Sequence, residues 1–283
     1  MFLKRIMDIR IYVITHKSTK IPKIPRYVSL LAGASLRREE GSFDEKDNTG
    51  IHISERNRSF CELTGLYWIW KNSDADVAGV SHYRRFFSRS EFLADEKYYL
   101  REKDIAGILL KHRLIVPKKF YYGTSLLQAI NYAPNIKDMK ELYQAIMVCA
   151  PDYEADYRWY LRQNQTYFFN MCIMKKNDFD AYCSWLFPIL FYFEKLHNID
   201  IERDWYRKRL FGFVAERMLP VWLHHNVDIS EIAEMPVINT DESLKTRIRR
   251  WAGNYIRKFR YKMTRYSSRA MERQHILENF IFK

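Results

Sequence analysis

Apolar positions recur at two different spacings along the chain, and they predict alternating strands and helices. Ile9 to Thr15, IRIYVIT, is a β-prone run, and residues 77–80 form a second apolar run with Gly79 inside it, typical of a buried strand in a parallel sheet. Between them, residues 63–70 place apolar groups on one face of a helix, which the polar residues 71–73 end.

The same alternation continues through the rest of the chain. Helices are expected over 105–111, 136–147 and 204–223, with another opening around Asp178, and a strand is expected over 113–116. This order predicts an α/β fold with a mostly parallel sheet flanked by helices. We expect one domain over residues 1–242 and a separate tail over 243–283.

Two of the predicted strands end in residues suited to binding an anion. In open α/β sheets, ligands bind at the carboxyl ends of the strands. One strand leads from Thr15 into His16 and Lys17, and the other is expected to end in His82, Tyr83, Arg84 and Arg85. Guanidinium groups can take two oxygens of a phosphate at once. The alternative is that one arginine pairs with a carboxylate at the edge of the core while the aromatic rings pack.

Two polar residues stand inside apolar segments. Asn170 is expected in an apolar strand, where its amide either fixes a backbone loop or faces a ligand, and we favour the loop. Glu216 lies between apolar residues of a predicted helix, and such surroundings disfavour the ionised carboxylate, as for a general base. An ordinary ion pair with Arg217 or Arg209 is the alternative for Glu216.

Positive charge is concentrated at the C-terminus. The net charge of the chain is +13, and residues 243–283 hold twelve Lys or Arg against two Glu. Aromatic and basic residues alternate there, at spacings that allow an aromatic helix face opposite a cationic one. This pattern favours an anionic membrane surface as partner. A helix packing its aromatic stripe on the domain, or a nucleic-acid site, are the alternatives.

Several site classes have no signature in the sequence. There is no GxGxxG and no GxxxxGK[ST] motif, so no dinucleotide fingerprint or P-loop is predicted. The four cysteines form no CxxC pair, which suggests neither a zinc site nor a disulfide framework. No apolar run is long enough to span a bilayer, and the first eight residues lack the apolar core of a signal peptide. A cytoplasmic protein is expected.

Six ordered motifs resemble the DUF4422 family. They are THK at 15–17, DNTG at 47–50, FCELTGLYWIWKN at 60–72, HYRRFF at 82–87, FNMCIMKK at 169–176 and RLFGFVAERMLPVWL at 209–223. That family comprises bacterial glycosyltransferases of capsule, exopolysaccharide and O-antigen (lipopolysaccharide) synthesis with a GT-A-like, Rossmann-type fold. The resemblance implies transfer of a hexose, galactose in pyranose or furanose form among the candidates, from a UDP-sugar to a lipid-linked oligosaccharide. It places the protein at the inner face of the plasma membrane.

The resemblance also implies roles for individual residues. The donor-binding residues would be Thr15, His16, Lys17, Asp47, Asn48, Glu62, His82, Tyr83, Arg84 and Arg85. Asn170 would approach the donor sugar or the acceptor, and Glu216, with Asp204 second, would be the catalytic base of an inverting enzyme.

Metal dependence is where the chain differs from many GT-A enzymes. Their Asp-x-Asp motif, which holds a divalent metal, corresponds in this sequence to His82-Tyr83-Arg84. We therefore expect Arg84 and Arg85, with His82, to replace the metal in whole or in part. No obligate cofactor is predicted, and Mn²⁺ or Mg²⁺ are the metals that would serve. The competing hypothesis is a non-enzymatic basic protein that binds a membrane surface or nucleic acid through its tail. Under the enzyme hypothesis no nucleic-acid partner is expected.

Overall fold

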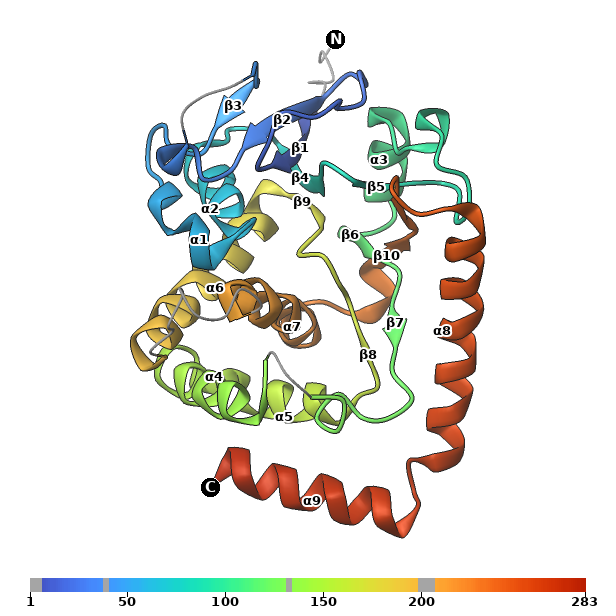
Figure 1. Cartoon of the computed structure of the whole chain (residues 1–283). Helices are drawn as coiled ribbons and strands as arrows, with labels where there is room; N and C mark the ends of the chain where they lie inside the picture. The colour runs from blue at the N-terminus through green and yellow to red at the C-terminus, as the bar shows by residue number, and fades with distance from the viewer. Residues whose placement is uncertain (1–6, 38–40, 131–133, 198–206) are drawn as a thin grey trace. The chain divides into compact units, whose positions relative to one another are not determined.

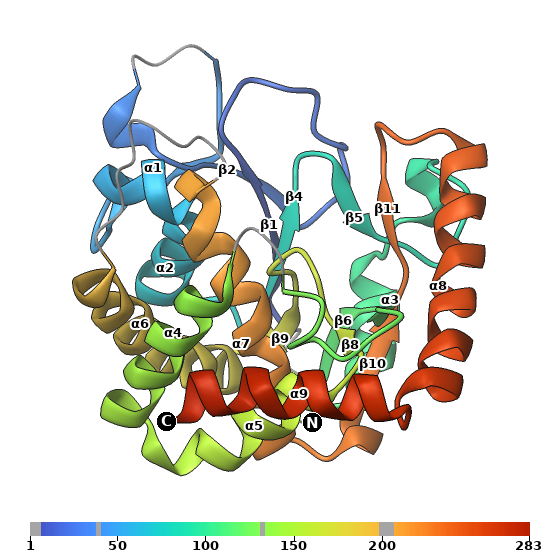
Figure 2. The same cartoon turned by 60° about the horizontal axis from the view of Figure 1, so that its bottom comes forward.

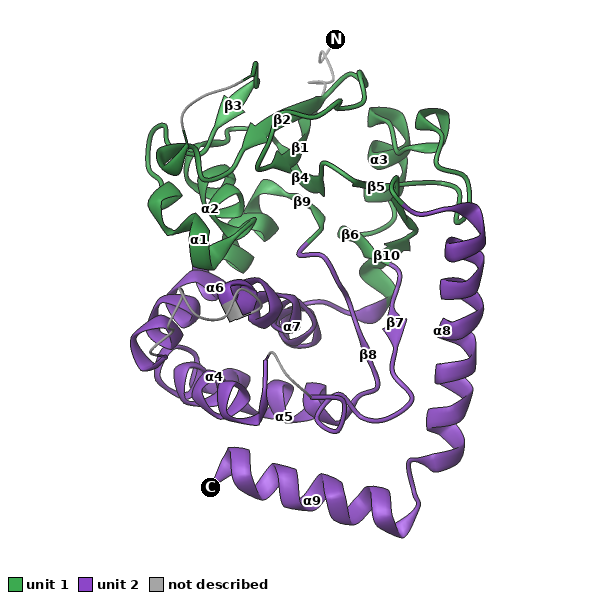
Figure 3. Cartoon of the chain, viewed as in Figure 1, with its two compact units in different colours: residues 1–117, 171–183, 230–241 green, residues 118–170, 184–229, 242–283 purple. Residues whose placement is uncertain are grey.

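The structure is a computed structural model that describes residues 7–37, 41–130, 134–197 and 207–283 (Figure 1). Contacts within the chain define two compact units (Figure 3). Unit 1 comprises residues 1–117, 171–183 and 230–241, and unit 2 comprises residues 118–170, 184–229 and 242–283. Each unit is thus assembled from three separate segments, and residues 243–283 are grouped with unit 2.

Unit 1 is built on a nine-stranded sheet among the described residues, with the order β10-β6-β9-β4-β1-β2-β3 and with β5 and β11 at the side of β4. The strands are β1 (Ile9–Thr15), β2 (Tyr27–Leu31), β3 (Glu45–Lys46), β4 (Val77–His82), β5 (Arg85–Phe87), β6 (Leu114–Pro117), β9 (Ile173–Lys175), β10 (Ile232–Met235) and β11 (Val237–Asn239). β1, β2, β3 and β4 are parallel, as are β6 and β10, whereas β9 runs antiparallel between β4 and β6. The expected α/β class with a mostly parallel sheet is confirmed.

Close packing explains why β4 carries a glycine. A Cβ atom on Gly79 would lie 2.3 Å from Cδ1 of Ile11 and 3.1 Å from Cγ1 of Ile173, on the strands at either side. Similarly, a Cβ atom on Gly65 of the helix α2 (Leu63–Asn72) would lie 3.0 Å from Cδ1 of Ile14. Small residues at these points let α2 and three strands approach one another. This close packing fixes the part of the sheet whose strands end at the candidate site.

Helices flank the sheet of unit 1. They are α1 (Asn57–Phe60), α2 (Leu63–Asn72), α3 (Glu102–Leu109) and the first residues of α6 (Lys176–Leu196), with short 3-10 turns at Ala34–Leu36, Ser54–Arg56, Glu96–Tyr98 and Ile229–Glu231. The helix expected over 63–70 is confirmed as α2, and the strand expected over 113–116 is β6, one residue displaced. The predicted helix 105–111 begins three residues earlier, because Asp104 accepts a hydrogen bond from the backbone N–H of Arg101 and caps it.

Unit 2 is mainly helical. It contains α4 (Ile136–Cys149), α5 (Glu154–Arg162), the remainder of α6, α7 (Leu210–Asn226), α8 (Leu244–Thr264) and α9 (Ser268–Phe282), with 3-10 turns at Pro151–Tyr153 and Arg207–Arg209 and a two-stranded sheet of β7 (Phe120–Tyr121) and β8 (Gln165–Thr166). The C-terminal helix α9 lies against α4 (Figure 2), where the Phe282 ring meets Tyr143 edge-on at 4.9 Å.

The basic helix α8 turns polar groups toward the rest of unit 2 and apolar groups outward. Asn254 accepts a hydrogen bond from the N–H of Tyr121 at 2.7 Å, and Arg257 Nε donates to the carbonyl of Tyr121 at 2.6 Å. The outward face carries what we call the α8 apolar stripe, whose residues are 47% to 85% exposed: Ile248, Tyr255, Ile256, Phe259 and Met263. Among the described residues, no helix combines the length and apolar character that crossing a membrane requires.

Candidate functional site

The carboxyl ends of four parallel strands meet at one edge of the sheet in unit 1. Register pairs Ile14 of β1 with His82 of β4, and Leu31 of β2 with both Thr15 and Lys46. The segments that follow these strands are 15–17, 33–36, 47–48 and 82–85. The sequence motifs THK, DNTG and HYRR are therefore neighbours in space, although the last residues of β1 and β4, Thr15 and His82, are 67 positions apart in the sequence.

The HYRR motif forms a tight hairpin, which corrects the expected strand end. β4 stops at His82, residues 83–84 make the turn, and Arg85 begins the antiparallel strand β5 opposite His82. The N–H of Tyr83 donates to the carbonyl of Ile14 at 3.2 Å, which ties this turn to β1. The strand bends back because β11 supplies an antiparallel partner for β5.

Three side chains lie close to the ring of Tyr83, and two of them, Lys17 and Arg84, are cationic. The His16 ring meets it edge-on with centroids 5.1 Å apart, and Lys17 Nζ and Arg84 Cζ lie 5.3 Å and 4.8 Å from the ring centroid. His16 and Lys17 are exposed, whereas Tyr83 is half-buried. His16, Lys17, Tyr83 and Arg84 thus form one positively charged cluster that is open to solvent, whereas Thr15 and His82 of the same two motifs are buried.

Arg84 already has an acidic partner. Its Nη1 donates to Asp241 Oδ2 at 2.8 Å, and this hydrogen bond is the main reason why the pKa of Arg84 is raised. The two side chains are 42% and 53% exposed, so the pair contributes about 1 kcal/mol or less to stability. Nε of Arg84 is a buried donor with no acceptor in the described part of the chain. An incoming anion could therefore displace Asp241 from Arg84 at a small cost in free energy.

Thr15 is buried and orders the loop after β1. Its hydroxyl donates to the carbonyl of Lys17 at 2.7 Å and accepts from the N–H of Lys17 at 3.3 Å. This side chain fixes the backbone that presents His16 and Lys17.

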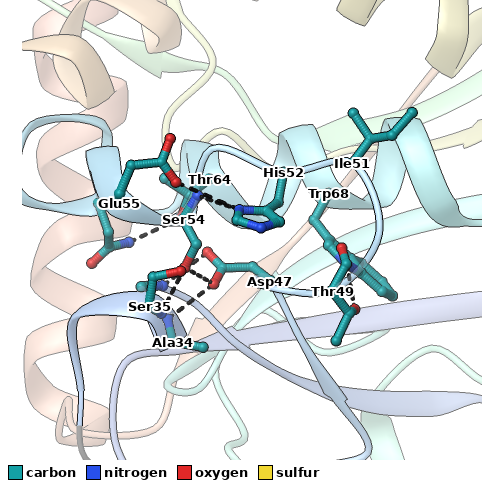
Figure 4. Close-up of polar contacts among 12 residues, drawn as sticks. Ala34, Ser35, Asp47, Thr49, Ile51, His52, Ser54, Glu55, Thr64 and Trp68 are labelled. Carbon is teal, nitrogen blue, oxygen red and sulfur yellow. Dashed lines mark hydrogen bonds and ion pairs between the residues drawn. The ribbon is translucent and has the colours of Figure 1, made fainter.

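Asp47 is fully buried, and its carboxylate organises a neighbouring turn (Figure 4). It accepts hydrogen bonds from the N–H groups of Gly33 at 2.8 Å and Ala34 at 3.0 Å, and from Ser54 Oγ at 2.5 Å. Gly33 has a φ of 71°, and a Cβ atom there would meet Asn57 at 2.5 Å. In this structure Asp47 has no surface for a ligand, so its part in the site is to hold the turn after β2.

Asn48 and Glu62 are two further residues that the family resemblance assigns to donor binding. Asn48 is half-buried in the turn after β3, and Glu62 is half-buried at the residue before α2. The same turn is tied to α2, since Trp68 Nε1 donates to the carbonyl of Thr49 at 2.9 Å. The contact of either side chain with a donor stays a prediction.

Asn170 lies in a turn before β9, and the expectation that it stands inside a strand is wrong. Phe169 and Asn170 have φ values of 81° and 50°, which an extended strand excludes. Two residues of α7 hold this turn: Glu216 Oε1 accepts from the N–H of Phe169 at 2.9 Å, and the carbonyl of Gly212 accepts from Asn170 Nδ2 at 3.1 Å. The interpretation that Asn170 fixes a loop agrees with this geometry.

Glu216 is half-buried beside a small cavity in unit 2. The cavity holds about 10 Å³, roughly the room of one water molecule, and Tyr160, Thr166 and Phe168 also line it. In this conformation Glu216 is a hydrogen-bond acceptor for a strained turn, and its role as a base stays a prediction. Asp204, the second candidate, lies outside the described residues.

One group in unit 2 has the composition of a metal site. Asp138 and Glu141 of α4 and His197 after α6 bring their ligand atoms within 4.8 Å of one another. The His197 ring is hydrogen-bonded to Glu141, and Asp138 accepts from the N–H of Asn135 at 2.7 Å, so these groups also satisfy one another as a buried polar cluster. Sequence reasoning overlooked this group, and its only signal was an acidic pair three residues apart on one helix.

Comparison with known proteins agrees with this architecture. The family model described as "Domain of unknown function (DUF4422)" matches residues 10–227. Among solved structures, the apo structure titled "WbbM bifunctional glycosytransferase" is similar, with a TM-score of 0.73 and 25% identity over 83% of this chain and 46% of that one. The present chain therefore spans about half the length of that structure, and the curated proteins include no significant match. Since the family model covers most of the sequence, the chain belongs to the DUF4422 family.

Proposed function

We propose that this protein is a glycosyltransferase that moves a hexose, such as galactose in its pyranose or furanose form, from a UDP-sugar to a lipid-linked oligosaccharide. Family membership and the likeness to a glycosyltransferase structure support the reaction class. The observation that carries the proposal is the cationic cluster around Tyr83 at the carboxyl edge of the parallel sheet.

Charge is the central requirement of this reaction. When the bond between sugar and diphosphate breaks, negative charge develops on the departing nucleoside diphosphate, and fixed cations lower the energy of that state. Lys17 and Arg84 both lie over the Tyr83 ring and would contact the diphosphate. In this proposal Arg84 leaves Asp241 for the donor, while Thr15 and Asp47 keep the surrounding turns in place.

The hairpin is poorly suited to hold a divalent metal. Of its residues 82–85, only His82 has a side chain that commonly ligates metals, and the nearby Asp241 carboxylate is engaged by Arg84. We propose that Arg84 and Arg85, with His82, supply the positive charge that a metal gives in many related enzymes. Mn²⁺ or Mg²⁺ would then stimulate the reaction at most modestly.

Glu216 is our first candidate for the base that deprotonates the acceptor hydroxyl, and Asp204 is the second. The hydrogen bond from the N–H of Phe169 engages one carboxylate oxygen, Oε1, and fixes the side chain. A general base must be held in a defined orientation, and this hydrogen bond contributes to that. Asn170, at the same turn, would contact the sugar or the acceptor.

The α8 apolar stripe supports a place at a membrane surface. α8 holds eight Lys or Arg and no Asp or Glu, and its apolar residues face outward while Asn254 and Arg257 face the rest of unit 2. A helix with exposed aromatic groups between cations is suited to lie in the interface of an anionic bilayer. We propose that the protein is a peripheral protein of the inner face of the bacterial plasma membrane.

A donor-binding and transfer experiment tests the proposal. UDP-hexoses, with ADP-glucose as a control, are screened by thermal shift, since a ligand that binds only the folded state raises the melting temperature. The ligand that gives the largest shift is then used in transfer assays before and after exhaustive chelation. We expect a shift with one UDP-sugar, its loss in Arg84→Ala, and transfer that survives chelation. Transfer that requires added Mn²⁺ or Mg²⁺ would contradict the proposal that arginines replace the metal. If no UDP-sugar raised the melting temperature, the proposed glycosyltransferase function would be contradicted.

A further inference from the structure

A cavity of about 860 Å³ lies in unit 2 where α8 turns into α9, and it is separate from the residues discussed so far. Its walls come from α8 and α9, from the loop 123–128 and from Arg162 at the end of α5. A cavity of this volume is in the range that accommodates small-molecule ligands.

The lining of this cavity is strongly cationic. Five arginines and one glutamate contribute to it: Arg162, Arg260, Arg265, Arg269, Arg273 and Glu278. Glu278 is paired with Arg162, whose Nε and Nη2 donate to the two carboxylate oxygens at 2.8 Å and 2.9 Å. This pairing lowers the pKa of Glu278. Within the described ranges, the other four arginines form no ion pair with a carboxylate. Four guanidinium groups therefore remain for an anionic ligand.

The amino end of α9 also lines this cavity, since α9 begins directly after Ser267. Ser267 Oγ caps the helix by accepting from the N–H of Ala270 at 3.3 Å, and the amino end of this 15-residue helix carries a partial positive charge that favours a nearby anion. The hydroxyls of Thr124 and Thr264 line the cavity as well, but they donate to the carbonyls of Ser125 and Arg260. The arginines therefore supply the donors for phosphate oxygens, and the helix end adds a favourable field.

The walls are fixed before any ligand binds. Ser125 Oγ donates to Gln274 Oε1 at 2.6 Å, and Gln128 Nε2 donates to the carbonyl of Ala270 at 2.7 Å, so the loop holds the first turns of α9. Tyr261 of α8 donates to the carbonyl of Arg162 at 3.0 Å. The backbone around this cavity therefore needs little rearrangement when a ligand enters, and the entropy cost falls mainly on the exposed arginine side chains.

We propose that this cavity binds a diphosphate, and that in the function proposed above, on which this part rests, it holds the diphosphate of a lipid-linked acceptor. A lipid-linked diphosphate is esterified at both ends, so each of its two phosphate groups keeps about one negative charge and two terminal oxygens. Four guanidinium groups can engage both phosphate groups at once, whereas a single phosphate offers its oxygens to fewer of them. The same chemistry is present in a soluble diphosphate, so the test includes both sources.

The test measures the affinity of the full chain for inorganic pyrophosphate by calorimetry. All variants carry Arg84→Ala, so that the hairpin contributes little. Arg269→Ala combined with Arg273→Ala removes two cavity cations, and Lys245→Ala combined with Arg249→Ala removes two exposed α8 cations outside the cavity. We expect the cavity variant to weaken the affinity about tenfold or more and the control to leave it nearly unchanged. Equal affinities in both variants would overturn the proposal.

Vesicles then separate the two sources of diphosphate. Phosphatidylcholine vesicles with and without a polyprenyl diphosphate are compared in flotation assays. Extra binding that the cavity variant loses supports the lipid-linked ligand, whereas no extra binding overturns that part and leaves a soluble diphosphate. An oligonucleotide that binds the cavity more tightly than pyrophosphate would overturn the diphosphate assignment. Because these readouts need no sugar transfer, an inactive enzyme would contradict the proposed function and leave the cavity result standing.

Discussion

Arg84 and Asp241 form an ion pair with 2.8 Å between Nη1 and Oδ2, although 157 positions separate them in the sequence. The contact joins the turn after β4 to the end of β11, where the N–H of Thr240 also donates to the carbonyl of Arg84 at 2.9 Å. Asp241 therefore occupies the guanidinium group that we assign to the donor diphosphate. The carboxylate and the ligand should therefore compete for Arg84, so the affinity for the ligand should depend on Asp241.

Asp241→Asn is expected to raise the affinity for UDP about two- to fivefold. The substitution keeps the size of the side chain and removes the charge that a diphosphate must displace, and exposed pairs of this kind contribute about 1 kcal/mol or less. Calorimetric titration with UDP measures the change. Asp74→Asn is the matched control, since Asp74 is an exposed aspartate of unit 1 that pairs with Arg10 instead. An equal gain in both variants would mean that net charge, and not release of Arg84, is responsible.

Asp47→Ala is expected to lower the free energy of unfolding by about 3 kcal/mol, because it leaves three buried donors without their acceptor. Chemical denaturation followed by circular dichroism measures the loss. Glu55→Ala, at an exposed position near the same turn, should change stability little. If Asp47→Ala kept full stability but lost UDP binding, Asp47 would contact the donor directly, and holding the turn after β2 would not be its main role.

The elements nearest the candidate site could be predicted from the sequence because local periodicity and burial agree there. β1 is confirmed at Ile9–Thr15, and α2 and β4 follow the predicted order. An apolar strand next to an amphipathic helix has few other ways to bury its surface, and parallel pairing then brings the strand ends together. The neighbourhood of THK and HYRR follows from these local patterns.

The contacts that complete the site join segments that are distant in the sequence, so no local sequence pattern predicts them. The pairing of β5 with β11 bends the chain back at Tyr83 and brings Asp241 to Arg84. The positive φ of Phe169 falls on a residue type that rarely adopts it, and hydrogen bonds with α7 hold it and the neighbouring Asn170 in place. Which face of α8 turns outward likewise depends on Asn254 and Arg257 meeting β7.

Glu216→Gln is expected to abolish sugar transfer and to leave UDP affinity unchanged. The amide keeps an oxygen that can accept from the N–H of Phe169, so the turn should be preserved, whereas the proton-accepting carboxylate is lost. Transfer rates and UDP titrations are measured on the same preparation.

Two further variants show whether the Glu216 result is specific. Glu272→Gln on the exposed face of α9 should keep full activity, and Asp204→Asn tests the second candidate. A fully active Glu216→Gln variant would show that Glu216 is not the catalytic base. If Asp204→Asn were inactive at the same time, the base would be Asp204.

Replacing two residues of the α8 apolar stripe, Ile256→Asn with Phe259→Asn, is expected to reduce binding to phosphatidylglycerol vesicles about tenfold or more. Both side chains are about two-thirds exposed, so the folded protein loses little packing, while the bilayer loses two apolar groups that each contribute about 1.5–3 kcal/mol when fully buried. Flotation at fixed salt measures binding. Ile229→Asn, at another exposed apolar position of unit 2, is the control and should bind like the parent. If all three proteins bound equally and high salt released them, charge alone would hold the protein at the membrane, and the outward stripe would need a protein partner instead.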